Sequence, residues 1–216
     1  MNWNDHSKLV GKHAILSPSG YSWLNYDNKE EAKEKLYSRY LSNYAQEVGT
    51  LVHEFACKRI QYRMPLRKRD QDAIIFYLLD NGIPRNVIDL DYFYENLFYY
   101  INDAIDYRMS PEVVLYYSDN CFGTTDAIYY DKNILRIHDL KTGKSPAHIE
   151  QLEIYAALFC LEYKKKPSDL DMELRIYQPG NLLTMKPDID DIVPIMDKIV
   201  SSDKFLSKIE KEGAIQ

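Results

Sequence analysis

The run of residues 134–141 constrains the fold most, because it is largely apolar and then ends in two opposite charges. It reads Ile-Leu-Arg-Ile-His-Asp-Leu-Lys, and its apolar and β-branched residues predict a strand. Side chains alternate along a strand, so Asp139 and Lys141 point to one face and Leu140 points to the other. The sequence therefore predicts an acid–base pair at the end of a buried strand.

A second acid precedes this strand, in the stretch 120–130. That stretch ends in Ile-Tyr-Tyr, which favours a strand, and the polar residues 131–133 are typical of a hairpin turn. The hairpin can bring Asp126 beside Asp139, and Gly123 permits a bulge or a close backbone approach. Two carboxylates on adjacent strands suit Mg²⁺ or Mn²⁺. A lysine beside them can orient a water or stabilise charge that develops on a phosphate.

A helix is predicted directly after these strands. Residues 147–163 carry apolar side chains at helical spacing. Gln151 and Tyr155 are four residues apart, so they lie on one face near the start of the helix. Because the helix begins just after the strand that carries Asp139, this face can look toward the same cleft.

Each of these short motifs is weak when it stands alone. Asp-x-Lys at a strand end is usually a solvated ion pair, Gly-x-x-Asp is a common turn, and Gln-x-x-x-Tyr has little specificity. Their order along a strand, hairpin, strand and helix is what favours a functional interpretation.

The four motifs together resemble the PD-(D/E)XK nuclease superfamily, in particular its RecB-like branch with the CRISPR adaptation nucleases and phage exonucleases. That branch carries Gly-x-x-x-His, Gly-x-x-Asp, Asp-x-Lys and Gln-x-x-x-Tyr in this order, found here at Gly49–His53, Gly123–Asp126, Asp139–Lys141 and Gln151–Tyr155. Residues 13–20 and 23–25 also look like the opening of phage and prophage members of the group. The resemblance covers roughly residues 16–177.

The resemblance implies a set of metal ligands. Asp126 and Asp139 would bind one or two Mg²⁺ or Mn²⁺ ions, and the main-chain carbonyl of Leu140 would add a ligand. His53 would be a ligand or a phosphate contact, with a half-buried structural histidine as the alternative. Glu112 would assist through a ligand or a water, and it can equally pair with a basic side chain.

The resemblance also implies the chemistry and the substrate. Lys141 would position the attacking water or offset charge on the phosphate, and Gln151 and Tyr155 would hold the DNA strand or order Lys141. The implied substrate is DNA with single- or double-stranded ends, cut to leave 5′-phosphates. The expected role is an exonuclease of phage or prophage recombination or replication, with a phage recombination protein as a candidate partner.

The expected fold is α/β, a restriction-endonuclease-like core with a mixed central sheet in the order α-β-β-β-α-β, flanked by helices. We expect one domain over residues 1–216, with a helical part at 16–108 that contains His53, a catalytic core at 110–178 and C-terminal helices at 188–212. The core strands are predicted at 111–117, 120–130, 134–141 and 171–177. The helices are predicted at 21–24, 29–44, 46–62, 70–79, 90–107, 147–163, 189–200 and 204–211.

Charge is distributed unevenly along the chain. The net charge of −6 argues mildly against a general nucleic-acid binder, so local clusters matter more. A basic cluster follows His53 and comprises Lys58, Arg59, Arg63, Arg67, Lys68 and Arg69. Lys164, Lys165 and Lys166 form a second one. Either cluster can hold a phosphate backbone, and a solvated helix face is an equally good interpretation.

Several classes of protein are excluded or disfavoured. The three cysteines, Cys57, Cys121 and Cys160, form no zinc or disulfide pattern and are too few for a four-cysteine iron–sulfur cluster. No apolar run approaches a membrane span, and the first residues do not read as a signal peptide, so we expect a cytoplasmic protein without a membrane partner. The many tyrosines of residues 92–107 are expected to pack between helices.

A second functional class remains open. The same fold can serve as a non-catalytic module that holds DNA or a protein partner, and the acidic net charge favours it. The presence of Asp126, Asp139 and Lys141 at matched positions argues for catalysis instead. An oligomer is possible, and the sequence does not indicate the number of its subunits.

Overall fold

Residues 6, 8, 14–16, 18, 22, 24–143 and 146–213 are described by a computed structural model. The helix predicted at 21–24 and the opening segment at 13–20 and 23–25 fall largely outside these described residues. The chain divides into two compact units, Met1–Val48 and Gly49–Gln216. Every candidate site residue belongs to the second unit.

The described part of the first unit is dominated by the beginning of helix α1 (Lys29–Gln61). The side chain of Asn28 accepts hydrogen bonds from the backbone N–H groups of Glu30 at 3.1 Å and Glu31 at 3.0 Å. These bonds satisfy donors that the first helical turn leaves without a partner. Within the same unit, Arg39 donates to the backbone carbonyl of Ile15.

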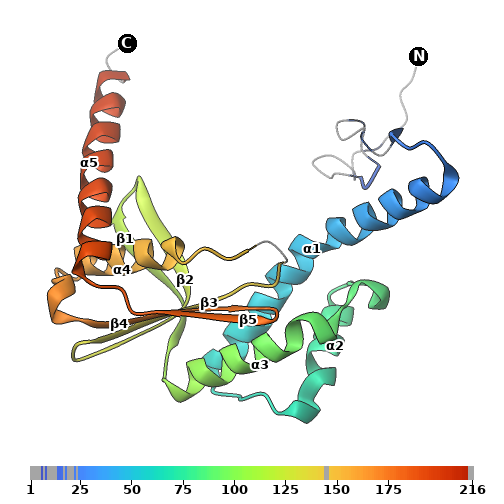
Figure 1. The fold of residues 1–216 in the computed structure, drawn as a ribbon, viewed down its shortest axis with the longest axis horizontal. Coiled ribbons are helices and arrows are strands. Elements are labelled where there is room, and N and C mark those ends of the chain that lie inside the picture. The colour runs from blue at the N-terminus through green and yellow to red at the C-terminus, as the bar shows by residue number, and fades with distance from the viewer. Residues whose placement is uncertain are drawn as a thin grey trace. The chain divides into compact units, whose positions relative to one another are not determined.

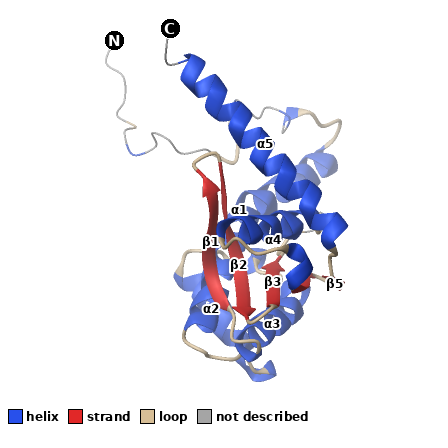
Figure 2. Cartoon of the chain, turned by 90° about the vertical axis from the view of Figure 1, so that its left-hand side faces the viewer, coloured by secondary structure: helices blue, strands red, loops and turns tan. Residues whose placement is uncertain are grey.

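A mixed five-stranded sheet forms the centre of the second unit (Figures 1 and 2). Its strands follow the order β1-β2-β3-β4-β5, and all neighbours are antiparallel except β3 and β4. Because β3 and β4 are parallel, they need a crossover, which helix α4 (Glu150–Glu162) supplies. The strands are β1 (Ser110–Ser118), β2 (Cys121–Asp131), β3 (Ile134–Leu140), β4 (Asp171–Gln178) and β5 (Asn181–Met185).

The main hydrophobic core lies between the sheet and α4. Leu135 and Ile137 of β3 are fully buried, and so are Leu152 and Ala156 of α4. Helix α5 (Ile189–Gly213) packs on α4 and adds Ile192 to this core. The alternation predicted for β3 is therefore present, with Leu135, Ile137 and Asp139 on the α4 side and Leu140 on the other.

Helix α3 (Leu90–Asp106) packs against β3 and β4 from the opposite side (Figure 1). The interface includes a polar network: Tyr177 donates to Asp103 at 2.6 Å, Arg175 contacts Asp103 at 3.1 Å, and the buried His138 ring lies 3.3 Å from the Tyr177 hydroxyl. The remaining elements are α2 (Gln71–Asp80) and the 3₁₀ segments Lys68–Asp70, Arg85–Val87 and Pro167–Asp169. None of the described helices is both long enough and apolar enough to cross a membrane.

The expected fold class is confirmed: a mixed sheet flanked by helices, with a helical N-terminal part before it. The helices predicted at 29–44 and 46–62 form the single helix α1, and those predicted at 189–200 and 204–211 form the single helix α5. Polar residues interrupt the apolar pattern in each case, but they do not end the helix. Pro194 lies inside α5 near its start. After β4 the chain turns into β5, an edge strand that the prediction lacked.

Candidate metal centre

Three potential ligands converge at one end of the sheet. One ligand atom from each of His53, Glu112 and Asp126 lies within 4.8 Å of the other two. The Nδ1 atom of His53 in α1 is 3.4 Å from Oδ2 of Asp126 in β2. An imidazole and two carboxylates are a donor set suited to a divalent cation, and the imidazole moves the preference toward Mn²⁺. Three of the residues that the sequence indicated as ligands therefore come together in a donor set that fits the expected ion, and Asp139 is not in this group.

Glu112 reaches this group through an unusual backbone conformation. The β1–β2 register places it opposite Asp126, between regular pairs on either side. Its φ is +52°, in the left-handed region that residues with a β-carbon rarely adopt. Strain of this kind is found at functional sites, where it aims a side chain.

The backbone of β3 fixes Asp126 from the other side. The N–H of Leu140 donates to Oδ2 of Asp126 at 2.8 Å. Leu140 is thus part of the site through its amide, and a role for its carbonyl as a ligand stays a prediction. The hairpin does bring Asp126 to the end of β3, as the turn at residues 131–133 indicated.

Asp139 and Lys141 form the second half of the site. Asp139 is 4% exposed, and Nζ of Lys141 lies 3.1 Å from its Oδ1 and 3.0 Å from its Oδ2. The ion pair leaves Oδ2 without hydrogen-bond geometry to any described residue. Lys141 also donates to Oε1 of Gln151 in α4 at 2.9 Å. A buried carboxylate oxygen without a hydrogen bond, such as Oδ2 of Asp139, can coordinate a cation. The ammonium of Lys141 is held in place by Asp139 and Gln151.

The electrostatics of the site favour protonation when no cation is bound. Burial raises the pKa of Asp139, and the charge of Asp126 adds to this, while Lys141 and His53 oppose it. Burial and then the charge of Asp126 raise the pKa of Glu112. Burial disfavours the imidazolium of His53, but its hydrogen bond to Asp126 and the surrounding carboxylates raise its pKa overall. A divalent cation would relieve this crowding of negative charge.

Tyr155 links the helix to the hairpin. Its hydroxyl donates to the carbonyl of Thr124 at 2.7 Å, and its ring lies against Gly123. A Cβ at Gly123 would come within 2.9 Å of Cε1 of Tyr155. The glycine of the Gly-x-x-Asp motif is therefore explained by the tyrosine of the Gln-x-x-x-Tyr motif.

Gly49 has a similar explanation on the other side of the site. A Cβ there would lie 3.1 Å from Oγ1 of Thr142, the residue directly after Lys141. Its close neighbour is the segment leaving β3. This contact keeps the His53 turn of α1 close to Lys141.

Two residues near the site were not singled out by sequence reasoning. Gln178 at the end of β4 donates to the carbonyl of Gly143 at 3.3 Å and accepts from the N–H of Ala147 at 3.1 Å, so it holds the segment after Lys141. Tyr100 of α3 is 2% exposed, and burial together with Asp126, Asp139 and Glu112 raises its pKa well above the usual value. No pattern in the sequence indicates Gln178, because its position depends on the parallel register, which pairs Leu140 with Tyr177.

The predicted basic cluster occupies the end of α1 and the segment that follows. Lys58 donates to the Tyr77 hydroxyl at 3.0 Å, and the Arg59 guanidinium lies over the Phe55 ring at 5.1 Å. Lys58 is about 7.5 Å along the helix axis from His53, at 1.5 Å per residue. The other members are exposed, namely Arg63, Arg67, Lys68 and Arg69. We call these six residues the basic patch.

A model of a protein family, described as a protein of unknown function (DUF2800), matches residues 13–207. This chain belongs to the DUF2800 family. All the site residues above lie within the matched span of the DUF2800 model. No curated protein and no solved structure matches the chain.

Proposed function

We propose that this member of the DUF2800 family is a nuclease that hydrolyses DNA phosphodiester bonds with Mg²⁺ or Mn²⁺. One observation carries the proposal: His53, Glu112 and Asp126 converge within 4.8 Å, and Lys141 forms an ion pair with the neighbouring Asp139. A hard donor set next to a positioned ammonium is the arrangement that phosphoryl chemistry uses. The order of the four sequence motifs supports the same conclusion.

Each residue has a distinct part in the proposed reaction. When bound, the ion supplies Lewis acidity, which polarises the scissile phosphate and lowers the pKa of a coordinated water. His53, Glu112 and Asp126 would hold it, with Asp139 at its side. Lys141 would donate to a phosphate oxygen as negative charge develops there. Gln151 keeps the Lys141 ammonium in place, and Tyr155 keeps α4 against β2.

The finer features of the proposal come from the resemblance to the RecB-like nucleases. They are action on DNA ends, 5′-phosphate products and a role in phage or prophage recombination beside a recombination protein. A cytoplasmic location belongs to the same proposal. The basic patch, which begins near His53, would hold the phosphate backbone.

The test is cleavage of end-labelled single- and double-stranded DNA with and without Mg²⁺ or Mn²⁺. We expect Lys141→Ala and Asp126→Asn each to lower the rate by about 100-fold or more. Titration calorimetry with Mn²⁺ should show binding retained by Lys141→Ala and lost by Asp126→Asn. Lys132→Ala, in the turn of the same hairpin, is the matched control and should cut normally.

A closed-circle substrate separates exonuclease from endonuclease action in the same assay. Cleavage that survives both substitutions would remove the catalytic assignment. A wild-type protein that binds Mn²⁺ and DNA but never cuts would favour the second candidate, a non-catalytic binding module. The net charge of −6 favours this candidate.

A further inference from the structure

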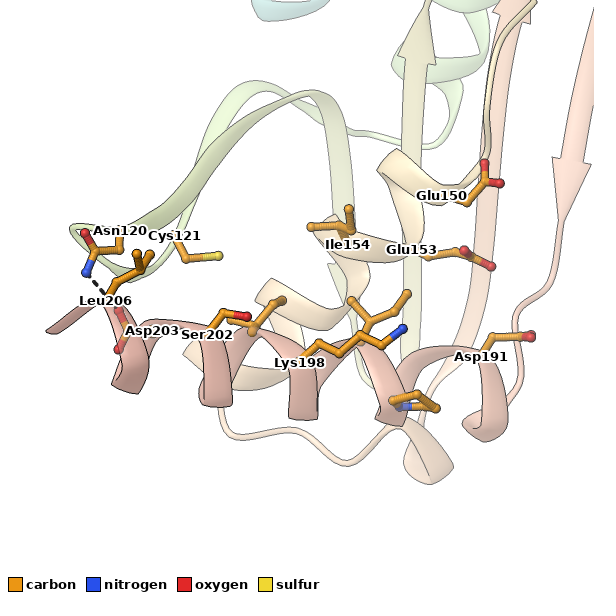
Figure 3. A pocket seen from close by; sticks show the side chains of 13 residues that line it. Asn120, Cys121, Glu150, Glu153, Ile154, Asp191, Lys198, Ser202, Asp203 and Leu206 are labelled. Carbon is orange, nitrogen blue, oxygen red and sulfur yellow. Dashed lines mark hydrogen bonds between the residues drawn. The ribbon is translucent and has the colours of Figure 1, made fainter. Parts of the chain in front are cut away.

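The two sides of the sheet differ in how their polar side chains are satisfied. On the α4 side, a groove of about 670 Å³ lies between α4, α5 and the turn that joins β1 to β2 (Figure 3). Polar side chains that line this groove, such as Glu150 and Ser202, are exposed and can bond to water. On the α3 side, the side chain of Tyr100 is only 2% exposed. Its hydroxyl therefore needs a hydrogen-bond partner close by.

The hydroxyl of Tyr100 forms no hydrogen bond with the described part of the chain. The phenol ring packs edge-on against Tyr177, with 5.5 Å between the ring centroids. Tyr177 is equally buried, yet its own hydroxyl donates to Asp103 at 2.6 Å, as buried tyrosines usually do. The buried side-chain atoms that lack a partner in the described residues do not include the Tyr100 oxygen. This oxygen therefore borders open space and not packed atoms.

The open space beside Tyr100 belongs to the metal centre. Helix α3 packs against β3 and β4, and the Tyr177 ring that Tyr100 contacts belongs to the residue that pairs with Leu140. The N–H of Leu140 in turn holds Asp126 at 2.8 Å. The Tyr100 hydroxyl thus lies at the end of β3, where the ligands of the centre converge.

Three carboxylates determine the protonation of this phenol. Burial raises the pKa of Tyr100 well above its usual value, and the charges of Asp126, Asp139 and Glu112 raise it further. The phenol therefore keeps its proton, so it offers a hydrogen-bond donor to whatever enters the site. A neutral donor beside a cation site suits an anionic oxygen that arrives with the substrate.

We propose that Tyr100 is a further catalytic residue, whose hydroxyl donates to a non-bridging oxygen of the scissile phosphate. This inference rests on the proposed nuclease function. Lys141, which Gln151 of α4 holds, approaches from the α4 side, whereas Tyr100 approaches from the α3 side. A phosphodiester has two non-bridging oxygens, so each donor can serve one of them. Both hydrogen bonds strengthen as negative charge develops on these oxygens.

The first test needs neither metal nor DNA. Tyr100→Phe removes only the hydroxyl, which no described residue bonds, so the urea midpoint of the variant should equal or exceed that of the wild type. Tyr177→Phe is the matched control, because it removes an equally buried hydroxyl that bonds to Asp103, and its midpoint should fall. A midpoint of Tyr100→Phe that falls as far would show that its hydroxyl has a partner within the protein, and it would overturn the proposal.

The second test measures cleavage. Tyr100→Phe should lower kcat by about 10- to 100-fold, with the wild-type affinity for Mn²⁺ by calorimetry, whereas Tyr177→Phe should cut at the wild-type rate. A substrate with one sulfur at the scissile phosphate exists as two stereoisomers. The effect of Tyr100→Phe should largely disappear for the isomer whose sulfur replaces the oxygen that accepts from Tyr100, and it should persist for the other.

The outcomes separate this inference from the proposed function. A wild-type protein that never cuts DNA would refute the nuclease activity, and the role of Tyr100 with it. A wild-type protein that cuts, beside a Tyr100→Phe variant that cuts equally well, would overturn the role of Tyr100 alone. An effect of Tyr100→Phe that is the same for both sulfur isomers would also overturn it, because the hydroxyl would then act on the fold and not on the phosphate.

Discussion

Glu112 combines two demands at one residue, since it supplies a carboxylate and holds a φ of +52°. Substitutions can separate these demands. Glu112→Asn and Glu112→Ala both remove the charge, so both should weaken Mn²⁺ binding by about tenfold or more. Asparagine tolerates the left-handed region better than alanine. We therefore expect the free energy of unfolding to be about 1 kcal/mol larger for the asparagine variant than for the alanine variant.

Urea denaturation of the metal-free proteins measures the difference in stability, and calorimetry measures Mn²⁺ binding. Equal stability of the two variants would show that the backbone at Glu112 is not strained. Unchanged Mn²⁺ affinity in both would remove Glu112 from the ligand set.

The protonation of the site predicts opposite effects of pH on metal binding and on stability. The pKa values of Asp139, Glu112 and His53 are all raised in the folded protein, and ligands must lose their protons to bind a cation. Mn²⁺ affinity should therefore fall by more than about tenfold between about pH 8 and about pH 6. A titration at the two pH values measures this change.

The stability of the metal-free protein changes with pH in the opposite direction. A group whose pKa is raised by folding stabilises the fold below its unfolded pKa, and that contribution is lost as pH rises through the folded value. The metal-free protein should therefore lose stability from the carboxyl range up past 6.5, the ordinary pKa of histidine. Asp139→Asn should raise its melting temperature at about pH 8, and a lower melting temperature would contradict the assigned crowding.

At the scale of elements, the contact between Gly123 and Tyr155 fixes the distance between β2 and α4. Gly123→Ala should destabilise the protein by about 1–3 kcal/mol, because the new methyl would overlap the tyrosine ring. Gly143→Ala is the matched control, since none of the described atoms beyond its chain neighbours lies within 4 Å of a Cβ built there. Tyr155→Leu should restore most of the loss when combined with Gly123→Ala, and a urea-based double-mutant cycle measures this coupling. Additive effects of the two substitutions would show that they do not touch.

The elements around the site could be predicted from the sequence because local signals define them. The alternation in residues 134–141 gave the correct faces of β3, and the polar turn at 131–133 gave the hairpin. The parallel pairing of β3 with β4 also follows from a strand, helix, strand order. Asp126, Asp139 and Lys141 could therefore be expected to lie at the end of one sheet.

Other features depend on contacts that the sequence does not display. The edge strand β5 is short, and its pairing with β4 decides its conformation. Gln178 looks like any polar strand residue until its amide is seen to hold Gly143 and Ala147. The left-handed backbone of Glu112 is set by the β1–β2 ladder and the site, which no local pattern reveals.

At the scale of the whole molecule, an acidic chain must concentrate its positive charge to bind DNA. If the basic patch contacts phosphates, replacing Arg67, Lys68 and Arg69 with glutamine should flatten the dependence of log binding constant on log salt by about 2.7 for duplex DNA, at about 0.9 per contact. Binding measured by fluorescence anisotropy at several salt concentrations gives this slope.

The same replacement at Lys164, Lys165 and Lys166 provides the comparison. An unchanged slope for the basic-patch variant with a flatter one for the lysine variant would move the DNA path to the end of α4. Unchanged slopes in both would place the DNA path elsewhere on the molecule.

The three potential ligands, His53, Glu112 and Asp126, come from segments that meet at different stages of folding. Glu112 and Asp126 meet across a hairpin, whose strands pair after a short loop closes, whereas His53 joins them only after the chain from α1 to β1 has been brought round. We infer that the acidic half of the centre forms early and carries an unbalanced charge until α1 docks. A cation that needs His53 as a ligand would then bind only after α1 docks. Its binding during refolding would therefore measure the rate at which α1 docks.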